Sequence, residues 1–283
     1  GKESFFFFFS FQFRRRRFSL FLKEKLDEKK KTKKNVQGMY VMLDYHPGID
    51  IEGAERSVLS VDEFVAGWRD VLGSVLEAVP DARGRLLVDL FNEPDAFALT
   101  WNSAGGPLSV KSPAQEPRGL VPAASRPSLN ALYAAALDAL FPICRECVFL
   151  VEGGGQSSVP GVHWGNGFIT DGEVAARRGL QTPNAFFDAA IGAGAPWLRQ
   201  LALAPHIYCP RVSGAADCFE GRCLFEALDA SFGELTKGKG YCSPRNPANG
   251  RGSSPCFVFA AVIGELGSTL ENERETSCIA SVV

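Results

Sequence analysis

The stretch Leu86-Leu87-Val88-Asp89-Leu90-Phe91-Asn92-Glu93-Pro94 decides the fold of this chain. Its large apolar residues form one short run without Gly or Pro, and Asp89 is the only polar residue before Asn92. Such a run predicts a strand that is buried on both faces, as in a parallel sheet. Pro94 cannot donate a ladder hydrogen bond, so strand pairing should end near it. Asn92 and Glu93 are therefore expected at the carboxyl end of a core strand, where parallel sheets carry their functional groups.

The same architecture recurs along the chain. Further apolar runs that end in polar or small residues predict strands at residues 38–47, 147–152, 201–208 and 257–267. Helical patterns fall between the strands, at residues 60–79, 128–141, 184–198 and 224–235. This alternation predicts an α/β fold, either a doubly wound sheet or a (β/α)8 TIM barrel. The first strand is not followed by the Gly-x-Gly-x-x-Gly of a dinucleotide site, so the barrel is favoured.

Composition and charge exclude some functions. The chain has 283 residues, of which 46% are hydrophobic and 22% charged, with a formal net charge of −2. This length suits one large α/β domain with a sizeable core. The charge gives no electrostatic reason to expect nucleic acid or an anionic membrane as a partner. We expect a monomer.

The cysteines favour disulfides over a metal site. Of the eight cysteines, only Cys144 and Cys147 have the close spacing of a zinc-ligand pair, and three His leave little material for a metal centre. An even number of cysteines agrees better with disulfides in a secreted protein. We therefore expect no metal, and the disulfide connectivity stays open.

Residues 1–37 differ from the rest. They contain a Phe run at 5–9, an Arg run at 14–17 and a Lys-rich run at 23–34. The apolar run precedes the positive charge, the reverse of a signal peptide, and is too short to span a bilayer. We interpret this segment as a low-complexity leader outside the fold, disordered or a gene-model artefact, with a partial barrel at 38–283. The alternative is a polybasic membrane-surface anchor.

Two carboxylates are the leading catalytic candidates. Glu93 and Glu265 both follow apolar runs, and the strand ends of a barrel converge on one face. A pair of carboxylates suits cleavage of a glycosidic bond: one protonates the leaving oxygen, and the other attacks the sugar carbon or activates water. A separation of about 5 Å would indicate retention of configuration and a wider gap inversion, and the sequence leaves this open.

Other polar and aromatic residues fall at the same end of the predicted strands. The candidates for binding sugar hydroxyls are His46, Asn92, His206 and Tyr208. Tyr208 or His206 would also orient the nucleophile and keep it ionised. Trp101 and Trp164, in long loops on the same side, either stack on sugar faces or pack within their own loops.

Four ordered motifs carry a family resemblance: Asp44-Tyr45-His46, Phe91-Asn92-Glu93-Pro94, His206-Ile207-Tyr208 and Gly264-Glu265-Leu266-Gly267. They resemble the motifs that end the third, fourth, sixth and seventh strands of glycoside hydrolase family 5, the cellulase family of retaining (β/α)8 barrels. Asn-Glu-Pro alone is shared with related retaining families, whereas four motifs in one order are specific. The resemblance covers about residues 38–267.

The resemblance implies a secreted glycosidase that needs no cofactor or metal and acts on β-1,4-glucans, mannans or related polysaccharides. It implies that Glu93 is the acid/base and Glu265 the nucleophile of a double displacement. Asn92 would contact the 2-hydroxyl beside the scissile bond, and Tyr208 would hydrogen-bond Glu265. The other two matched residues, His46 and His206, would line the subsite on the non-reducing side of that bond.

The sequence departs from the family pattern at both ends. If residue 38 begins the third strand, the first two βα units, with the family's second-strand Arg, have no counterpart. The eighth strand and its Trp have none either. We expect an incomplete barrel, with about strands 3 to 7 present. An endo-β-1,4-glucanase is the leading interpretation. A β-mannanase or other β-glycanase of the same family, and a non-catalytic carbohydrate-binding pseudoenzyme fragment, are the alternatives.

Overall fold

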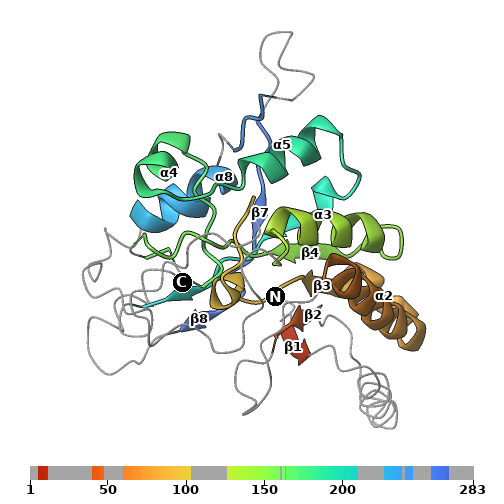
Figure 1. Cartoon of the computed structure of the whole chain (residues 1–283). Helices are drawn as coiled ribbons and strands as arrows, with labels where there is room; N and C mark the ends of the chain where they lie inside the picture. The colour runs from red at the N-terminus through yellow and green to blue at the C-terminus, as the bar shows by residue number, and fades with distance from the viewer. Residues whose placement is uncertain are drawn as a thin grey trace.

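The computed structural model describes the backbone of residues 6–11 and all of residues 40–47, 60–102, 126–159, 161–162, 164–209, 226–237, 240–244 and 256–267. Strands run through the centre of the molecule, and helices α2, α3 and α5 follow one another along one side of them (Figure 1). Within these residues, no helix is long and apolar enough to cross a bilayer.

The main sheet is parallel throughout, and each strand pairs with the next one of the sheet along the chain. Its strands are β1 (Phe6–Phe11), β2 (Tyr40–Tyr45), β3 (Leu86–Asp89), β4 (Val148–Val151), β5 (Leu201–Leu203) and β7 (Ala260–Ala261). A second parallel pair joins β6 (Ile207–Tyr208) to β8 (Leu266–Gly267). The α/β class and the sequential parallel order confirm that part of the barrel prediction. That the barrel is incomplete, with about strands 3 to 7 present, stays a prediction.

Two predicted strands are each divided in two. The run 201–208 forms β5 and β6, and the run 257–267 forms β7 and β8. Pro205 lies at the first break and has no N–H to donate to a ladder. On the far side of that break, the N–H of Ile207 donates to the carbonyl of Glu265 at 2.9 Å. The interruption therefore separates the last strand pair, which carries Tyr208 and adjoins Glu265, from the main sheet.

Within residues 1–37, which were expected to lie outside the fold, the structure describes strand β1, and the division into a leader and a catalytic region stays a prediction. Phe6–Phe11 pairs in parallel with β2, from Phe6 opposite Tyr40 to Phe11 opposite Tyr45. Aromatic residues favour strands, and β1 covers the edge of β2 that faces away from β3. The Arg and Lys runs of the leader lie outside the described residues.

The helices agree with the sequence patterns in part. They are α2 (Val61–Ala78), α3 (Leu129–Leu140), α4 (Gly172–Arg178), α5 (Asn184–Gly192) and α8 (Glu234–Thr236), with turns η1 (Pro80–Arg85), η2 (Pro94–Phe97), η5 (Leu198–Gln200) and η6 (Asp229–Gly233). The predictions for α2 and α3 are confirmed. The helix predicted at 184–198 ends early, at Gly192, and Gly194 follows with a φ of 60°. The short helix α4 was not predicted.

Helix α2 positions the end of β3. Its apolar positions, spaced at the helical period, are buried as Phe64, Trp68, Val71, Leu72, Val75 and Leu76. Trp68 also donates its indole N–H to the carbonyl of Leu90 at 3.1 Å. This bond joins the helix to the segment that leads from β3 into Asn92 and Glu93.

Replacing Ser60 by Ala should lower the free energy of unfolding by about 1 kcal/mol. Ser60 and Glu63 form a reciprocal capping box at the start of α2, in which each side chain accepts the backbone N–H of the other residue. Chemical denaturation monitored by circular dichroism measures the loss. Ser60→Thr retains both the capping oxygen and the hydroxyl that donates to Glu63 and is the matched control, so an equal loss in both variants would contradict this explanation.

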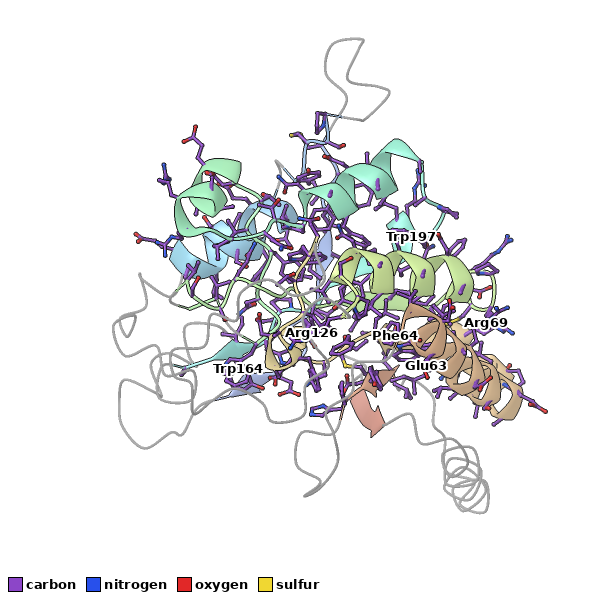
Figure 2. All side chains as sticks on the ribbon, viewed as in Figure 1. Glu63, Phe64, Arg69, Arg126, Trp164 and Trp197 are labelled. Atoms are coloured by element: carbon purple, nitrogen blue, oxygen red, sulfur yellow. A yellow bond between two sulfur atoms is a disulfide. The ribbon has the colours of Figure 1, made fainter. Side chains whose placement is uncertain are left out.

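The two faces of the main sheet bury different side chains. Leu43, Val88 and Phe149 belong to the large core shared with the helices, whose side chains fill the space between helices and strands (Figure 2). The alternate residues form a smaller cluster on the other face, made of Met42, Leu87, Leu150, Ala202 and Ala204. Side chains two positions apart in a strand lie on the same face. The residues that follow this cluster on the second face are Asp44, Asp89 and Glu152, which are polar and belong to the site described below.

Disulfides confirm the expectation from the cysteine count. Cys144 pairs with Cys147, and Cys242 pairs with Cys256. Cys209 is also disulfide-bonded, so no described cysteine is a free thiol. The Cys144-x-x-Cys147 spacing is therefore a disulfide rather than half of a zinc site.

Candidate active site

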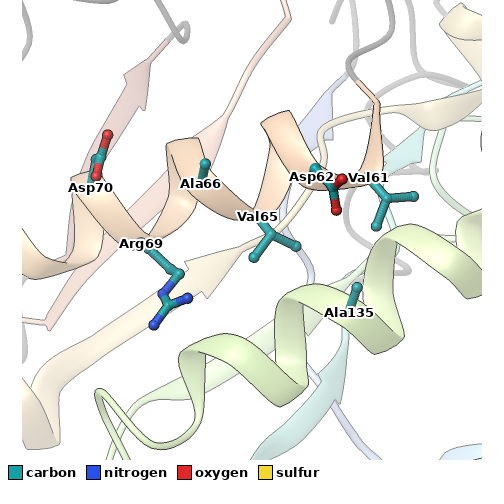
Figure 3. A pocket seen from close by; sticks show the side chains of 7 residues that line it. All are labelled: Val61, Asp62, Val65, Ala66, Arg69, Asp70 and Ala135. Carbon is teal, nitrogen blue, oxygen red and sulfur yellow. The ribbon is translucent and has the colours of Figure 1, made fainter.

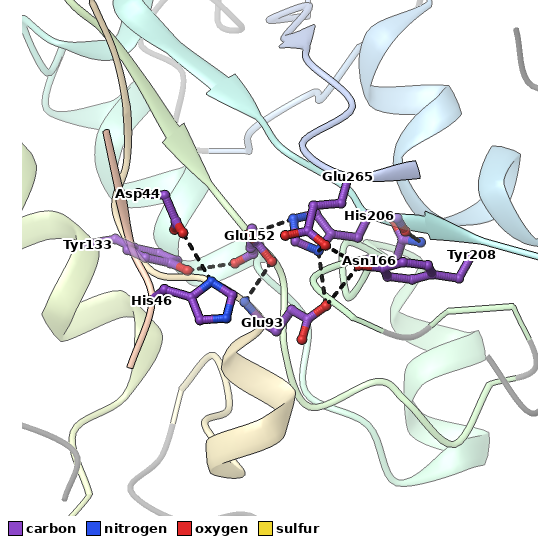
Figure 4. A network of polar contacts seen from close by, with 9 residues as sticks. All are labelled: Asp44, His46, Glu93, Tyr133, Glu152, Asn166, His206, Tyr208 and Glu265. Atoms are coloured by element: carbon purple, nitrogen blue, oxygen red, sulfur yellow. Dashed lines mark hydrogen bonds and ion pairs between the residues drawn. The ribbon is translucent and has the colours of Figure 1, made fainter. Parts of the chain in front are cut away.

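Glu93 and Glu265 lie together at the carboxyl end of the strands (Figure 4). Glu93 follows β3 and is almost buried, whereas the Glu265 side chain, just before β8, is 33% exposed. One carboxylate oxygen of each residue and one ring nitrogen of His206 all lie within 4.8 Å of one another. The predicted convergence of the two carboxylates is thus present in the structure.

Tyr208 bridges the two carboxylates. Its hydroxyl donates to Oε2 of Glu265, and its oxygen lies 3.4 Å from Oε1 of Glu93. Burial, followed by the neighbouring carboxylates, raises the pKa of the Tyr208 phenol. The hydroxyl therefore keeps its proton and stays a hydrogen-bond donor to Glu265.

His206 lies deeper in the site, between the carboxylates of Glu93 and Glu152. Its Nδ1 is 3.2 Å from Oε1 of Glu93, and its Nε2 is 3.1 Å from Oε1 of Glu152. A carboxylate beside each ring nitrogen favours the protonated, cationic form of the imidazole. Burial disfavours the charged ring, but the carboxylates of Glu152 and Glu93 outweigh burial and raise the pKa of His206. Asn166 fixes the backbone of His206 by donating its side-chain amide to the carbonyl at 2.5 Å.

Glu152 is the principal site residue that the sequence reasoning missed. It follows β4, is fully buried, and accepts the backbone N–H of Glu93 at Oε2 over 2.9 Å. Its own carbonyl accepts the hydroxyl of Tyr133 at 2.8 Å. Burial raises the pKa of Glu152 to about 7, against the lowering effect of His206.

Alternation along the strands is the signal that would have found Glu152. Three buried acidic residues each stand two positions after an inward apolar residue: Asp44 after Met42, Asp89 after Leu87 and Glu152 after Leu150. Residues two apart in a strand share a face, so these carboxyls cap the apolar cluster at the end that holds the site. Burial raises the pKa of both Asp44 and Asp89, and the charge of Glu152 raises that of Asp89 further.

His46 borders the same cluster. Its Nδ1 lies 3.2 Å from Oδ2 of Asp44, and its side chain is 35% exposed. The hydrogen bond with Asp44 raises the pKa of His46. This residue therefore presents a polar ring at the edge of the site, where the sequence placed it, and a contact with sugar stays a prediction.

The remaining candidates differ in position. Asn92 is buried beside Glu93, and its backbone N–H donates to the carbonyl of Tyr45 at 3.0 Å. Trp164 has a left-handed backbone, with φ 53°, and its ring packs edge-on against Tyr208 with centroids 6.3 Å apart. Both residues thus adjoin the catalytic candidates, while their contacts with sugar remain predictions.

Trp101 is not a sugar-stacking residue. Its side chain is fully buried, and its indole N–H donates to the carbonyl of Gly167 at 2.6 Å. The ring packs against Tyr133 and Phe168, with centroids 6.0 Å away in each case. A fully buried ring offers no face to a polysaccharide, so of the two alternatives the packing of its own loop is correct.

Among the residues that the structure describes, two side-chain groups have donor atoms close enough to share a metal ion. They are Asp89 with Glu152 and His206, and Glu93 with His206 and Glu265. In each group His206 faces a carboxylate with a ring nitrogen, an arrangement that balances acidic charge without an added cation. The absence of a metal and of a cofactor stays a prediction.

A separate groove lies between α2 and α3, with a volume of about 530 Å³ (Figure 3). Its walls are residues of the first turns of α2 and Ala135 of α3. None of the acidic residues described above lines this groove. The convergent carboxylates, rather than the groove, therefore define the candidate site.

Solved structures with a similar fold are bacterial endoglucanases. The catalytic domain of the major endoglucanase from Xanthomonas campestris pv. campestris matches with a TM-score of 0.50 and 20% identity, over 91% of this chain and 59% of that one. Pseudomonas stutzeri endoglucanase Cel5A, in complex with cellobiose, matches with a TM-score of 0.50 and 15% identity, over 97% and 65%. No family model and no curated protein sequence matches the chain.

At these identities the likeness shows the fold alone. The chain has a mostly parallel α/β fold of the TIM-barrel type found in these endoglucanases, and it spans about three-fifths to two-thirds of their length. A cellulase-like fold is thereby confirmed for the described strands and helices. Membership of glycoside hydrolase family 5 stays a prediction.

Proposed function

We propose that this chain is the catalytic part of a retaining glycoside hydrolase that cleaves β-1,4-glucan within the polymer. The observation that supports it best is the approach of Glu93 and Glu265, which bring carboxylate oxygens within 4.8 Å of each other. Retaining glycosidases hold their carboxyl groups about 5 Å apart, whereas inverting enzymes leave room for a water between them.

Tyr208 supports the division of roles. Its hydroxyl donates to Glu265 and so holds that carboxylate in a fixed position beside Glu93, as attack on a bound sugar requires. Glu265 then attacks the anomeric carbon while Glu93 protonates the leaving oxygen. In the second step Glu93 removes a proton from water, which displaces Glu265 and releases the sugar with its configuration retained.

The surrounding residues complete the proposal. Asn92 would bind the 2-hydroxyl, His46 and His206 would line the adjoining subsite, and Trp164 would stack on a sugar ring. The disulfides and the extracellular character of cellulose support a secreted protein, and we propose that it is a monomer. The proposed catalytic region is residues 38–283, with no nucleic acid, membrane, metal or cofactor required.

The test is the release of reducing sugar from carboxymethyl-cellulose, together with the configuration of the first product. Proton NMR of a short cello-oligosaccharide digest should show the β anomer before mutarotation. Hydrolysis with the α anomer first would contradict retention. Hydrolysis of mannan alone would change the substrate to that of a β-mannanase. Binding of glucan by the folded chain without turnover on any β-glycan would support the pseudoenzyme alternative.

A further inference from the structure

The buried carboxylate of Glu152 connects two parts of the site that the chain supplies from different strands. Its Oε2 accepts the backbone N–H of Glu93, which follows β3, and its Oε1 faces Nε2 of His206, which lies between β5 and β6. Glu152 itself is out of reach of substrate because it is fully buried behind both residues. Any effect on the reaction must therefore pass through Glu93 or His206.

The backbone of Glu93 needs such a partner. Its φ of 46° is in the left-handed region, which is unfavourable for a residue with a side chain. The hydrogen bond from its N–H to Glu152 spans 2.9 Å and is charge-assisted when Glu152 is ionised. Because the backbone sets the direction of the side chain, Glu152 helps to decide where the Glu93 carboxylate lies.

The ring of His206 depends on the same carboxylate. With Nε2 facing Oε1 of Glu152 at 3.1 Å, Nδ1 points at Oε1 of Glu93, 3.2 Å away, and lies 3.9 Å from Oε2 of Glu265. The titratable groups that face His206 are Asp44, Asp89, Glu93, Glu152, Tyr208 and Glu265. Of these, Glu152 is the fully buried acid in direct contact with Nε2.

The backbone at Gly165 packs directly against the side chain of Glu152. A Cβ on residue 165 would overlap Oε2 of Glu152, and Gly165 has a φ of 82° that favours glycine. Its carbonyl accepts the N–H of Gly153 at 2.7 Å, which keeps the loop against the end of β4. The carboxylate is thus held between the loop and His206 in one orientation.

We propose that Glu152 is a positioning residue, which holds the Glu93 backbone and the His206 ring in the arrangement that acid/base catalysis by Glu93 requires. This inference rests on the proposed function. The plainer explanation is a buried ion pair that stabilises the fold and has no effect on turnover.

Glu152→Gln separates the two explanations, with the exposed Glu146→Gln as the matched control. Gln has the same shape and still accepts the N–H of Glu93, but it carries no charge for His206. We expect kcat on carboxymethyl-cellulose to fall about 10- to 100-fold, as for a small misplacement of a catalytic group, with KM changed less. The pH optimum should move up, because the cation beside Glu93 and Glu265 is lost at neutral pH.

An NMR titration of the ring nitrogens provides a readout that needs no turnover. The chain has three His, so the spectrum of ¹⁵N-His protein is simple, and His206→Asn assigns the signal by its loss. In the wild type, the His206 ring should stay doubly protonated across neutral pH. In Glu152→Gln, the pKa of His206 should fall, because one of the two carboxylates that face the ring is lost while burial still disfavours the charged form.

The outcomes distinguish this inference from the proposed function. A folded Glu152→Gln with wild-type kcat, KM and pH profile would overturn the inference and leave the proposed function intact. A wild-type His206 that titrates near its ordinary pKa would overturn the inference, whether or not the protein hydrolyses a glycan. A wild type that hydrolyses nothing would contradict only the proposed function. If Glu152→Gln does not fold, Glu152→Asp, which keeps the charge but shortens the reach, should show a charged His206 with a lowered kcat. Unchanged kinetics in Glu152→Asp would contradict positioning.

Discussion

Glu265→Gln should lower kcat on carboxymethyl-cellulose by on the order of 10⁴-fold or more, because the nucleophile is removed while its shape is kept. The amide can still accept the Tyr208 hydroxyl, so the site should remain folded and continue to bind glucan. Reducing-sugar release measures turnover, and binding to insoluble cellulose measures affinity.

Glu93→Gln should reduce kcat about 10²- to 10⁴-fold, the usual range for an acid/base residue. The loss should be smaller for an aryl glycoside, whose leaving group needs little protonation. Glu146→Gln is again the control, since this side chain is exposed. Equal losses on both substrates would contradict the role of Glu93 as the acid, and full activity of Glu265→Gln would exclude it as the nucleophile.

Trp101→Ala should lower the free energy of unfolding by about 3–5 kcal/mol, as expected for a large aromatic residue removed from a core. Trp101 is fully buried, donates to Gly167 and packs against Tyr133, Phe168 and Phe186. The substitution removes the ring and leaves the Gly167 carbonyl without this donor. Urea denaturation monitored by circular dichroism measures the change.

Trp101→Phe is the matched variant for this prediction. It keeps most of the aromatic surface but loses the indole hydrogen bond, so its loss should be clearly smaller than that of Trp101→Ala. If Trp101 contacted polysaccharide instead, both variants would weaken glucan binding while stability stayed near that of the wild type. That result would reverse the assignment of this residue to the core.

The sequence predicted the parts of the fold that depend on local pattern. The apolar run before Asn92, and the helical period with the Ser60 capping box, were enough to place β3 and α2. The division of the last strands was missed, because an apolar run does not reveal where pairing changes partner. Strand β1 was missed because a homopolymeric run carries no alternation from which pairing could be read.

The candidate site was predicted where the strand ends could be recognised. Glu93, His206, Tyr208 and Glu265 do converge, although their roles remain proposals. Glu152 was overlooked because a strand-ending Glu in sequence reads equally as a group facing water. Its burial depends on the loop around Gly165, which lies close to it only in the folded chain.

The sequential parallel order of the strands has a consequence for the speed of folding. Val88 pairs with Phe149, and Phe149 pairs with Leu201, so each rung of the sheet joins residues on the order of 50 positions apart. Long segments must be closed before any such rung forms, and this costs chain entropy early. We therefore expect α2 and α3 to form first and the sheet to assemble slowly, strand by strand, with unpaired edges exposed to aggregation in the meantime.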